Sequence, residues 1–355
     1  MTNTDNENTK LPREALWQRI AVGIFAAGIW FISILPTRLA YAIGDLLAVP
    51  WFLVWCVRDR KGRRSSGYWR NTAIAFREGS LLGPSRPKHH LWSWSRHIGQ
   101  MVIDSCHMRH LTRENLPQHC DLSEYGPVKE VFDEGNGLIF TTGHIGVWDL
   151  SGVIAGLLDL PITSVFRPSP LPALNRLVSR MRSGTGQTMV ARKNVMWTLK
   201  KVLGEKKVIG LIADGGGKHS AVTAPFLGTA ARSVATPALL HLATGAPIVV
   251  AAIIRTGRRQ YRLRVYDIIR NASTGPGNRE KDLVAITTRC NHAVGKGIQE
   301  VPEQWLWHTR RFRHRPAGEQ PGPDGLPPLS PMLNDSSEPE PTERYRSPRS
   351  KHATG

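Results

Sequence analysis

The chain has 355 residues, of which 41% are apolar, and a formal net charge of +19. The apolar content is typical of a folded protein with a sizeable core, and the charge favours an anionic partner: a membrane surface, a phosphorylated lipid, an acidic protein or a nucleic acid. The four cysteines are far apart and form no CxxC pair, which argues against a zinc site or a disulfide framework and indicates a reducing compartment.

The N-terminal part of the chain is predicted to be a membrane element. A polar stretch over 1–14, expected to be disordered, precedes two apolar runs at 20–35 and 39–57, the second broken by Asp45 and Pro50. Because a membrane-crossing helix takes about 20 apolar residues, we predict an uncleaved anchor or a re-entrant hairpin over 15–64. A signal peptide and a buried amphipathic hairpin of a peripheral protein are the alternatives.

Residues around these two runs indicate how the element is oriented. Aromatic side chains that suit the headgroup level lie near the ends of the runs: Trp17, Trp30, Phe31, Trp51, Phe52 and Trp55. Basic side chains follow the second run directly: Arg58, Arg60, Lys61, Arg63 and Arg64. By the positive-inside rule, this cluster and the body of the protein behind it are expected on the cytoplasmic side.

The body of the chain alternates between strand-like and helix-like patterns. Strands are expected at 138–141, 162–166, 188–191, 208–212, 248–254 and 261–267, and helices at 148–158, 173–182, 195–203, 233–244 and 280–298. This alternation predicts an α/β fold with a mostly parallel sheet flanked by helices, within a domain over 65–315. A Gly-Arg-Arg turn before 261–267 predicts one antiparallel pair, and the Pro- and Ser-rich stretch 316–355 is predicted to be a disordered tail.

A histidine lies at the most informative strand-to-helix junction. The run 138–141 ends in a glycine-bounded turn that carries His144, and Asp149 follows in the first turn of the next predicted helix. A carboxylate there can hydrogen-bond one ring nitrogen and leave the other to take a proton from an alcohol. The alternative is a turn histidine satisfied by a backbone carbonyl, with Asp149 capping the helix. The chain shows no serine or cysteine in a nucleophile-elbow pattern, so this chemistry would need no covalent intermediate.

Further motifs follow in chain order. Phe166-Arg167-Pro168 comes after the second expected strand, and Asp214-Gly215-Gly216-Gly217 comes after the strand at 208–212. Pro225-Phe226-Leu227-Gly228 is interpreted as core plus turn, and Trp305 and Trp307 as packing residues. The other members of the series are Asn175, Arg180, Arg182, Gly184, Arg232 and the ending Pro302-Glu303-Gln304-Trp305-Leu306-Trp307 with Arg310-Arg311-Phe312. A solvated basic face is the alternative for the arginines, and Arg310, Arg311, Arg313 and Arg315 are expected to form a basic patch that faces a membrane or a carrier protein.

This series resembles the bacterial lipid A biosynthesis (late) acyltransferases, within the lysophospholipid acyltransferase superfamily, over roughly 15–315. The resemblance implies a glycerolipid acyltransferase-like fold and a membrane-bound enzyme that transfers a fatty acyl chain from acyl carrier protein or acyl-CoA to a lipid hydroxyl. It implies that His144 is the general base, that Asp149 holds its tautomer, and that Asp214 orients either Arg182 or the acceptor sugar. The resemblance implies further that Arg182 binds a phosphate or the developing oxyanion, and that the substrate-binding residues are Arg167, Asn175, Arg182, Asp214, Gly215 and Arg232.

The resemblance also implies a cellular setting. It places the protein in the bacterial inner membrane, with the catalytic domain on the cytoplasmic side and an anionic lipid as acceptor, and it implies no metal and no cofactor. We expect no nucleic-acid partner, since the chain shows no RNP-type, zinc or helix-turn-helix signature.

Two positions depart from the usual family pattern. The family often carries Glu where this chain has Asp149, and it usually continues the third motif as Asp-Gln-Asp where this chain has Asp214-Gly215-Gly216. The acceptor is therefore left open between a lipid A-type glycolipid and another lipid, of the phosphatidylinositol mannoside or ornithine-lipid kind. Three competing functions stay open: a nucleic-acid-binding protein, a lipid hydrolase that uses the same pair on water, and a non-catalytic membrane or anionic-ligand binding protein.

Overall fold

The computed structural model of the chain describes residues 16–60, 67–78, 80, 82–83, 87–183, 186–192, 195–217, 221–272, 277–316, 318–322 and 324–329. The predicted disordered start at 1–14, most of the predicted tail and the basic residues Lys61, Arg63 and Arg64 lie outside these residues.

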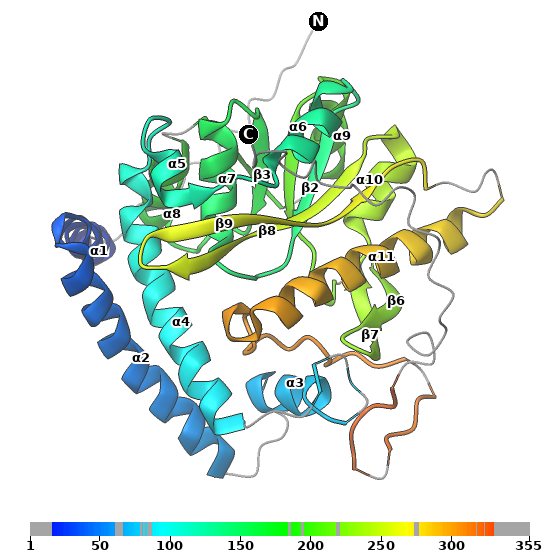
Figure 1. Cartoon of the computed structure of the whole chain (residues 1–355), viewed down its shortest axis with the longest axis horizontal. Coiled ribbons are helices and arrows are strands. Elements are labelled where there is room, and N and C mark those ends of the chain that lie inside the picture. The colour runs from blue at the N-terminus through cyan, green and yellow to red at the C-terminus, as the bar shows by residue number, and fades with distance from the viewer. Residues whose placement is uncertain are drawn as a thin grey trace, which may run out of the picture.

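A seven-stranded sheet forms the centre of the protein (Figure 1). Its order is β1 (Cys120–Asp121), β9 (Gln260–Ile269), β8 (Ile248–Gly257), β2 (Leu138–Thr142), β5 (Val208–Ile212), β3 (Ile162–Phe166) and β4 (Thr188–Ala191). The strands from β8 to β4 run parallel, β9 pairs antiparallel with β8, and β1 pairs parallel with β9. The predicted α/β class, the mostly parallel sheet and the antiparallel pair are confirmed.

Both faces of this sheet are covered by helices, which explains why its strands are continuous apolar runs. Along β8, Val249, Ala251 and Ile253 join one apolar cluster while Ile248 and Val250 join another, as a side-chain period of two requires. The helices of the body are α5 (Leu116–His119), α6 (Tyr125–Asp133), α7 (Trp148–Leu157), α8 (Pro172–Ser183), α9 (Met196–Gly204), α10 (Thr236–Thr244) and α11 (Arg279–Glu300). Residues of α6 and α7 lie in the first cluster, and residues of α9, α10 and α11 lie in the second.

One hairpin differs from the expected pattern. The strands β6 (Ala221–Phe226) and β7 (Thr229–Val234) pair antiparallel, so the helix predicted from residue 233 begins only at Thr236. Leu227 and Gly228 both have positive φ, of 47° and 78°, which is the backbone of a tight hairpin turn. Along β7 buried and half-buried residues alternate, a period of two that a helix cannot have.

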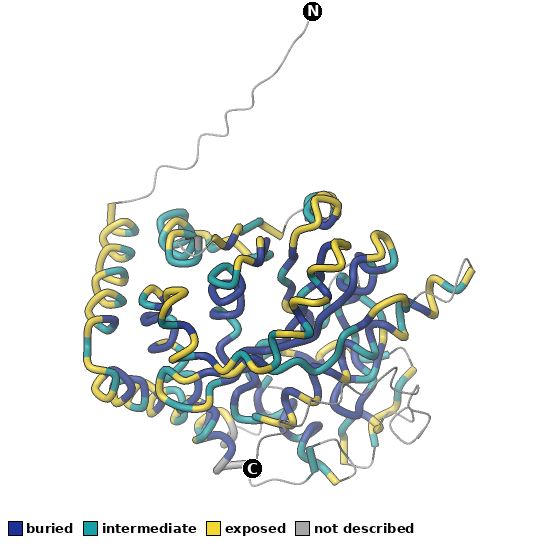
Figure 2. Tube along the Cα trace, turned by 45° about the horizontal axis from the view of Figure 1, so that its top comes forward, coloured by how far each residue is buried: buried dark blue, intermediate teal, exposed yellow. Residues whose placement is uncertain are grey.

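Two apolar helices precede the body: α1 (Leu16–Ile34) and α2 (Thr37–Arg60). Both are long and apolar enough to cross a membrane, by length and composition only. Only 6% of the apolar window of α1 is buried, against 28% for α2, and Figure 2 shows α1 exposed along much of its length. Pro50 lies inside α2 without ending it.

The helix α2 packs against a further helix, α4 (Pro87–His107). The helix α4 runs beside α2 (Figure 1), and the short helix α3 (Gly67–Ala75) lies between them in sequence. The helices approach closely at Gly44 and Gly99, where a Cβ added to Gly99 would lie 2.0 Å from the carbonyl oxygen of Gly44. Beside this contact, Asp45 accepts hydrogen bonds from Arg96 (2.9 and 3.2 Å) and Gln100 (2.7 Å) on α4. The charged residue that interrupts the apolar run therefore has its partners within the protein.

The described part of the predicted tail lies without helix or strand between 316 and 329. Asp324 is 3.8 Å from Arg77, and Leu326 packs against the apolar cluster that includes Ile248. The disorder predicted for the remainder of 316–355 stays a prediction.

The Gly44–Gly99 contact can be tested by adding one methyl group. We expect Gly99→Ala to lower the free energy of unfolding by about 1–3 kcal/mol, because the new Cβ meets backbone and forces α2 and α4 apart. Gly126→Ala on α6 is the matched control: nothing lies within 4 Å of its added Cβ, so the loss of glycine entropy should leave it neutral or more stable. Thermal unfolding of both variants in detergent measures this, and equal melting temperatures would contradict the contact.

Candidate active site

His144 and Asp214 are brought together by strand register. The strands β2 and β5 are parallel neighbours in which Thr142 pairs with Ile212, and each strand ends there. His144 and Asp214 each come two residues later, so they meet at the same edge of the sheet. This is the carboxyl edge of the parallel strands, where ligands bind in open α/β sheets.

The carboxylate of Asp214 is the best-satisfied polar group of this edge. Its Oδ1 accepts from His144 Nδ1 at 2.8 Å, and its Oδ2 accepts from the backbone N–H of His144 at 2.8 Å and from Trp305 Nε1 at 2.8 Å. The Asp214 side chain is 3% exposed and the Trp305 residue is fully buried. A hydrogen bond donated by Nδ1 places the imidazole lone pair on Nε2.

Charge and burial shift the protonation of this pair in opposite directions. Burial disfavours the carboxylate of Asp214, but the charge of His144 and the hydrogen bonds from His144 and Trp305 outweigh it and hold the pKa of Asp214 at about 2. Burial likewise disfavours the imidazolium of His144, but Asp214, and to a smaller degree Asp149, raise its pKa above the ordinary value. His144 is therefore a stronger base than a free imidazole, and Asp214 stays ionised.

Asp149 does not hold the Nδ1 tautomer of His144, and this expectation is wrong. It lies in the first turn of α7 and pairs instead with Arg182 of α8, at 2.6 Å from Nη2 to Oδ1. Asp214 was expected to orient either Arg182 or the acceptor sugar, and its carboxylate instead accepts hydrogen bonds from His144 and Trp305. Asp149 lies at the start of α7 and reaches Arg182 of α8, whereas Asp214 follows β5, the direct neighbour of β2, and so lies beside His144. Asp149 still lies close enough to raise the pKa of His144.

Two other side chains contact or influence the His144 ring. Trp148 lies edge-on to it, with ring centroids 5.2 Å apart. His308 has its pKa lowered by burial and by the charge of His144. Sequence reasoning assigned no site role to Trp148, Trp305 or His308. For Trp305 a signal existed in the Pro-Glu-Gln-Trp ending, but its partner could not be read without the fold.

The remaining expected site residues lie on several different elements. Arg167 follows β3, the neighbour of β5, and is exposed. Asn175 ties its own loop, since its Oδ1 accepts from Ser169 N–H and its Nδ2 donates to Ser169 C=O, both at 2.8 Å. The carbonyl oxygen of Gly215 accepts from Val234 N–H at 3.1 Å, which lays β7 against the residue after Asp214.

Arg232, on β7, lines a basic hollow. The other residues of this hollow are Ala221, Val222, Thr223, Arg313, His314, Arg315 and Pro316. Arg315 pairs with Glu319 at 2.6 Å, and Arg313 and His314 are exposed. The concentration of guanidinium groups makes the hollow suited to an anion.

The expectation that Arg311 belongs to a basic patch facing a membrane or a carrier protein is wrong, because its side chain is buried. It is 2% exposed, and its guanidinium stacks 4.1 Å from the ring centroid of Phe226 while donating to Arg232 C=O (2.6 Å) and to the Ser233 hydroxyl (2.7 Å). Burial lowers its pKa to about 10. Arg311 therefore supports the β6–β7 hairpin from inside, whereas Arg310 and Arg313 are exposed.

The part of the chain that the structure describes contains no group of three or more His, Cys, Asp or Glu side chains that could hold a metal ion. The four cysteines are all free, and Cys106, Cys120 and Cys290 are buried.

The fold and site define an α/β protein that carries a paired histidine and aspartate, His144 and Asp214, at the carboxyl edge of a mostly parallel sheet. Residues 10–314 match the family described as bacterial lipid A biosynthesis acyltransferase. The chain belongs to this family, and it is an acyltransferase.

Curated relatives span most of the chain. This chain is 28% identical over 318 residues to the lipid A biosynthesis palmitoleoyltransferase of Escherichia coli (strain K12). The aligned residues cover 87% of this chain and 97% of that protein. A lipid A biosynthesis acyltransferase of Shigella flexneri matches with the same identity and coverage. A lipid A biosynthesis acyltransferase of Haemophilus influenzae is 23% identical over 258 residues, or 71% of this chain and 80% of that protein.

The contact between Asp214 and His144 predicts how the histidine titrates. We expect Asp214→Asn to lower the pKa of His144, because the main interaction that raises it is lost, whereas Asp149→Asn should lower it less. Histidine Cε1–H NMR titrations of the wild type and both variants measure this, with His144→Gln used for assignment. A His144 that titrates at the same pH in wild type and Asp214→Asn would contradict the arrangement.

The same shifts predict a pH dependence of stability. The raised pKa of His144 contributes stability that is present below its ordinary value of about 6.5 and is lost as pH rises through the folded-state value. The lowered pKa of Asp214 contributes stability that is present above 3.8 and is lost as pH falls through about 2. We therefore expect the stability difference between wild type and Asp214→Asn to be larger at pH 6 than at pH 9, as measured by denaturant unfolding. A difference that grows from pH 6 to pH 9 would contradict it.

Proposed function

We propose that this acyltransferase moves a fatty acyl chain from a thioester donor, acyl carrier protein or acyl-CoA, to a hydroxyl of a lipid A-type glycolipid. The hydrogen bond between Asp214 and His144 Nδ1 is the observation that carries the proposal. It leaves Nε2 of a partly exposed imidazole, 31% by its side chain, as the group that accepts the proton of the acceptor hydroxyl.

The proposed reaction needs no covalent enzyme intermediate. The acceptor oxygen forms a bond to the thioester carbonyl carbon while its proton moves to His144 Nε2. The tetrahedral intermediate then collapses and the C–S bond breaks. The leaving thiolate accepts the proton from the imidazolium and departs as a thiol. Asp214 stabilises the imidazolium that exists between these two proton transfers, as a buried carboxylate does in other base-plus-orienter pairs.

Arg182 and Asp149 are assigned a supporting role in this proposal. Their ion pair connects the start of α7, next to the His144 loop, to the end of α8. A guanidinium held there is suited to bind a phosphate of a substrate or the developing oxyanion. Arg167, on the neighbouring strand end, is exposed and is proposed as a second contact for an anionic substrate.

The membrane setting is part of the proposal. The two apolar helices α1 and α2 support attachment to the bacterial inner membrane, with the site on the cytoplasmic side. The basic hollow around Arg232 supports an acceptor that carries a phosphate, since a phosphorylated headgroup is an anion presented at a membrane surface. The shorter carboxylate Asp149 and the Gly215-Gly216 pair distinguish this chain from the usual family pattern, so a phosphatidylinositol mannoside- or ornithine-lipid-like acceptor is the second candidate.

The first experiment tests acyl transfer and names the acceptor. Membranes that contain the wild type or His144→Ala are incubated with labelled acyl carrier protein, or labelled acyl-CoA, and the host's lipid extract. We expect label to enter a lipid with the wild type and to fall by about 100-fold or more with His144→Ala, since general base catalysis contributes about 10²–10⁴-fold. Mass spectrometry of the labelled lipid identifies the acceptor.

Two results would contradict the proposal. Equal labelling by both proteins would remove His144 as the base, and release of free fatty acid without acceptor would indicate a hydrolase.

The basic hollow predicts a selective effect on the acceptor. Arg232→Gln combined with Arg313→Gln should raise KM for a phosphorylated acceptor by at least about tenfold, since each charged hydrogen bond contributes about 1.5–3 kcal/mol, and should leave KM for the dephosphorylated acceptor unchanged. Arg270→Gln, an exposed arginine paired with Glu134, is the control. A uniform effect on both acceptors would rule out phosphate binding there.

A further inference from the structure

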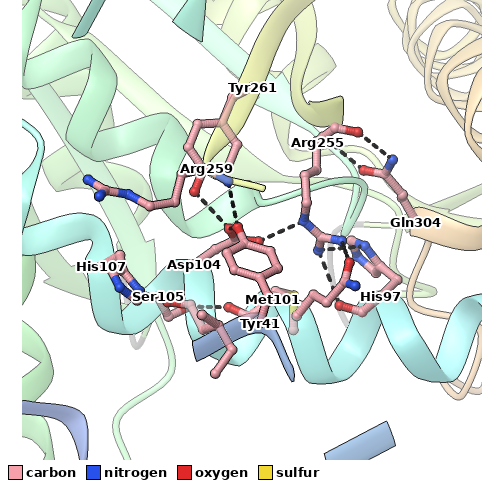
Figure 3. Close-up of polar contacts among 12 residues, drawn as sticks. Tyr41, His97, Met101, Asp104, Ser105, His107, Arg255, Arg259, Tyr261 and Gln304 are labelled. Carbon is pink, nitrogen blue, oxygen red and sulfur yellow. Dashed lines mark hydrogen bonds and ion pairs between the residues drawn. The ribbon is translucent and has the colours of Figure 1, made fainter. Parts of the chain in front are cut away.

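A buried polar cluster joins the apolar helix α2, the helix α4 and the end of β8, and Figure 3 shows its contacts around Asp104 and Arg255. Its centre is the ion pair between Asp104 of α4 and Arg255 of β8, with Nε 2.8 Å from Oδ2. The side chains are 0% and 8% exposed. A buried charge is costly unless it is paired and hydrogen-bonded, so this cluster must keep its geometry for the fold to be stable.

Arg255 binds α4 with its whole guanidinium. Beside the bond to Asp104, its Nη1 donates to Gln100 Oε1 at 2.8 Å, and its Nη2 donates to His97 Nδ1 at 2.9 Å and to the His97 carbonyl at 3.2 Å. Burial and the charge of Arg255 hold the pKa of His97 well below its ordinary value, so His97 is neutral and can accept this bond. Arg255 thus contacts three polar side chains along one face of α4.

The other side of the cluster reaches α2. The Tyr41 hydroxyl donates to Asp104 Oδ1 and accepts from Arg259 N–H at 2.8 Å, and the Tyr261 hydroxyl donates to Asp104 at 2.7 Å. Gln100, which accepts from Arg255, donates its amide to Asp45 of α2 at 2.7 Å. Two separate chains of hydrogen bonds therefore link the placement of α2 on α4 to Arg255.

The backbone of Arg255 is held by Gln304. The Gln304 Oε1 accepts from Arg255 N–H and its Nε2 donates to the Arg255 carbonyl, both at 2.9 Å. The carbonyl of Gln304 accepts from Gly146 N–H at 2.9 Å. One residue therefore binds the end of β8 with its side chain and the His144 loop with its backbone.

The backbone of the His144 loop is closely packed against the end of β8 and the segment around Gln304. Gly146 has φ of +62°, and a Cβ on it would lie 2.1 Å from the carbonyl oxygen of Ile253. Val147 N–H donates to that oxygen at 2.8 Å, and Leu306 N–H donates to the His144 carbonyl at 3.0 Å. The loop is held between the end of β8 and the segment around Gln304, and a shift of either would move the imidazole.

We propose that Gln304 and Arg255 are positioning residues for acyl transfer, which hold the His144 loop in register with the α2–α4 pair. The Arg255 side chain binds α4 and the Gln304 side chain binds the backbone of Arg255, so both act on the His144 loop through the bond from Gly146 N–H to the Gln304 carbonyl. The inference rests on the proposed function of His144 as general base. It makes the activity depend on how α2 docks on α4, outside the His144–Asp214 contact itself.

The test uses the full chain in detergent or membranes, with Gln304→Met as the main variant. Methionine keeps the length of the side chain and removes both hydrogen bonds to Arg255. We expect kcat to fall by about 10-fold to 100-fold while KM for the acyl donor stays within about threefold, because misplacement of a catalytic group by about 1 Å costs that much. Gln187→Met is the matched control, since Gln187 is equally buried, at 6% exposure, and its amide donates to Ser164 instead.

A second readout separates positioning from stability. The groups that face His144 are Asp214, Asp149 and His308, and a loosened loop weakens the Asp214 contact most. We therefore expect the acid limb of kcat/KM, and the NMR titration of His144, to move to lower pH in Gln304→Met and to stay in place in Gln187→Met. Loss of stability alone would move neither.

A second variant keeps the test decisive if Gln304→Met does not fold. Arg255→Lys keeps a positive charge against Asp104 but loses the guanidinium hydrogen bonds to Gln100 and His97. We expect the acid limb of kcat/KM and the NMR titration of His144 to move to lower pH in this variant too. Variants that melt earlier but retain the wild-type kcat and His144 titration would overturn the inference. If the wild type transfers no acyl chain, the proposed function fails, while an unmoved titration in both variants overturns this inference separately.

Discussion

The buried carboxylate of Asp214 is the interaction on which the site depends. Taking a carboxylate out of water is unfavourable unless donors replace the lost hydration, and here three N–H groups do so within one small volume. Two come from His144 and one from Trp305, so the carboxylate joins the end of β2, the end of β5 and the C-terminal segment. The bond from His144 Nδ1 also fixes the tautomer of the imidazole, so this one carboxylate stabilises the fold and orients the histidine.

The C-terminal segment packs against the His144 loop and binds Asp214 through Trp305. Trp305 and Trp307 are fully buried, with ring centroids 4.7 Å apart, and Ile145 forms a backbone bridge with Trp305. Gln304, between the helix α11 and Trp305, joins β8 to the loop of His144. The Pro-Glu-Gln-Trp-Leu-Trp ending therefore supports the loop, the strand end and the buried carboxylate at once, which gives a physical reason for its distinctive sequence.

The N-terminal helices show how one element meets two environments. The face of α2 that carries Tyr41, Gly44 and Asp45 packs on α4, where its polar groups are paired. Leu46, Leu53 and Val57 are exposed from the same helix, as are most apolar residues of α1. A charged residue within an apolar run weakens a membrane span when only the sequence is considered, but the structure gives Asp45 a protein partner and leaves the apolar face of α2 outward.

The sequence by itself determined most strands of the main sheet, the family and the enzyme class. Four strands, at 162–166, 188–191, 208–212 and nearly 138–142, follow from apolar runs bounded by turn residues, and the family and the enzyme class follow from motifs that are contiguous in the chain. It could not decide which carboxylate binds His144. Asp149 is five residues away in sequence and Asp214 seventy, but only the order of the strands puts β5 beside β2. The same holds for Arg255, Gln304 and Asp104, whose contacts cross 49 and 151 residues of chain. Local patterns report the neighbours along one helix or strand, whereas strand order and helix docking are set by burial summed over the whole core, which only the tertiary structure resolves.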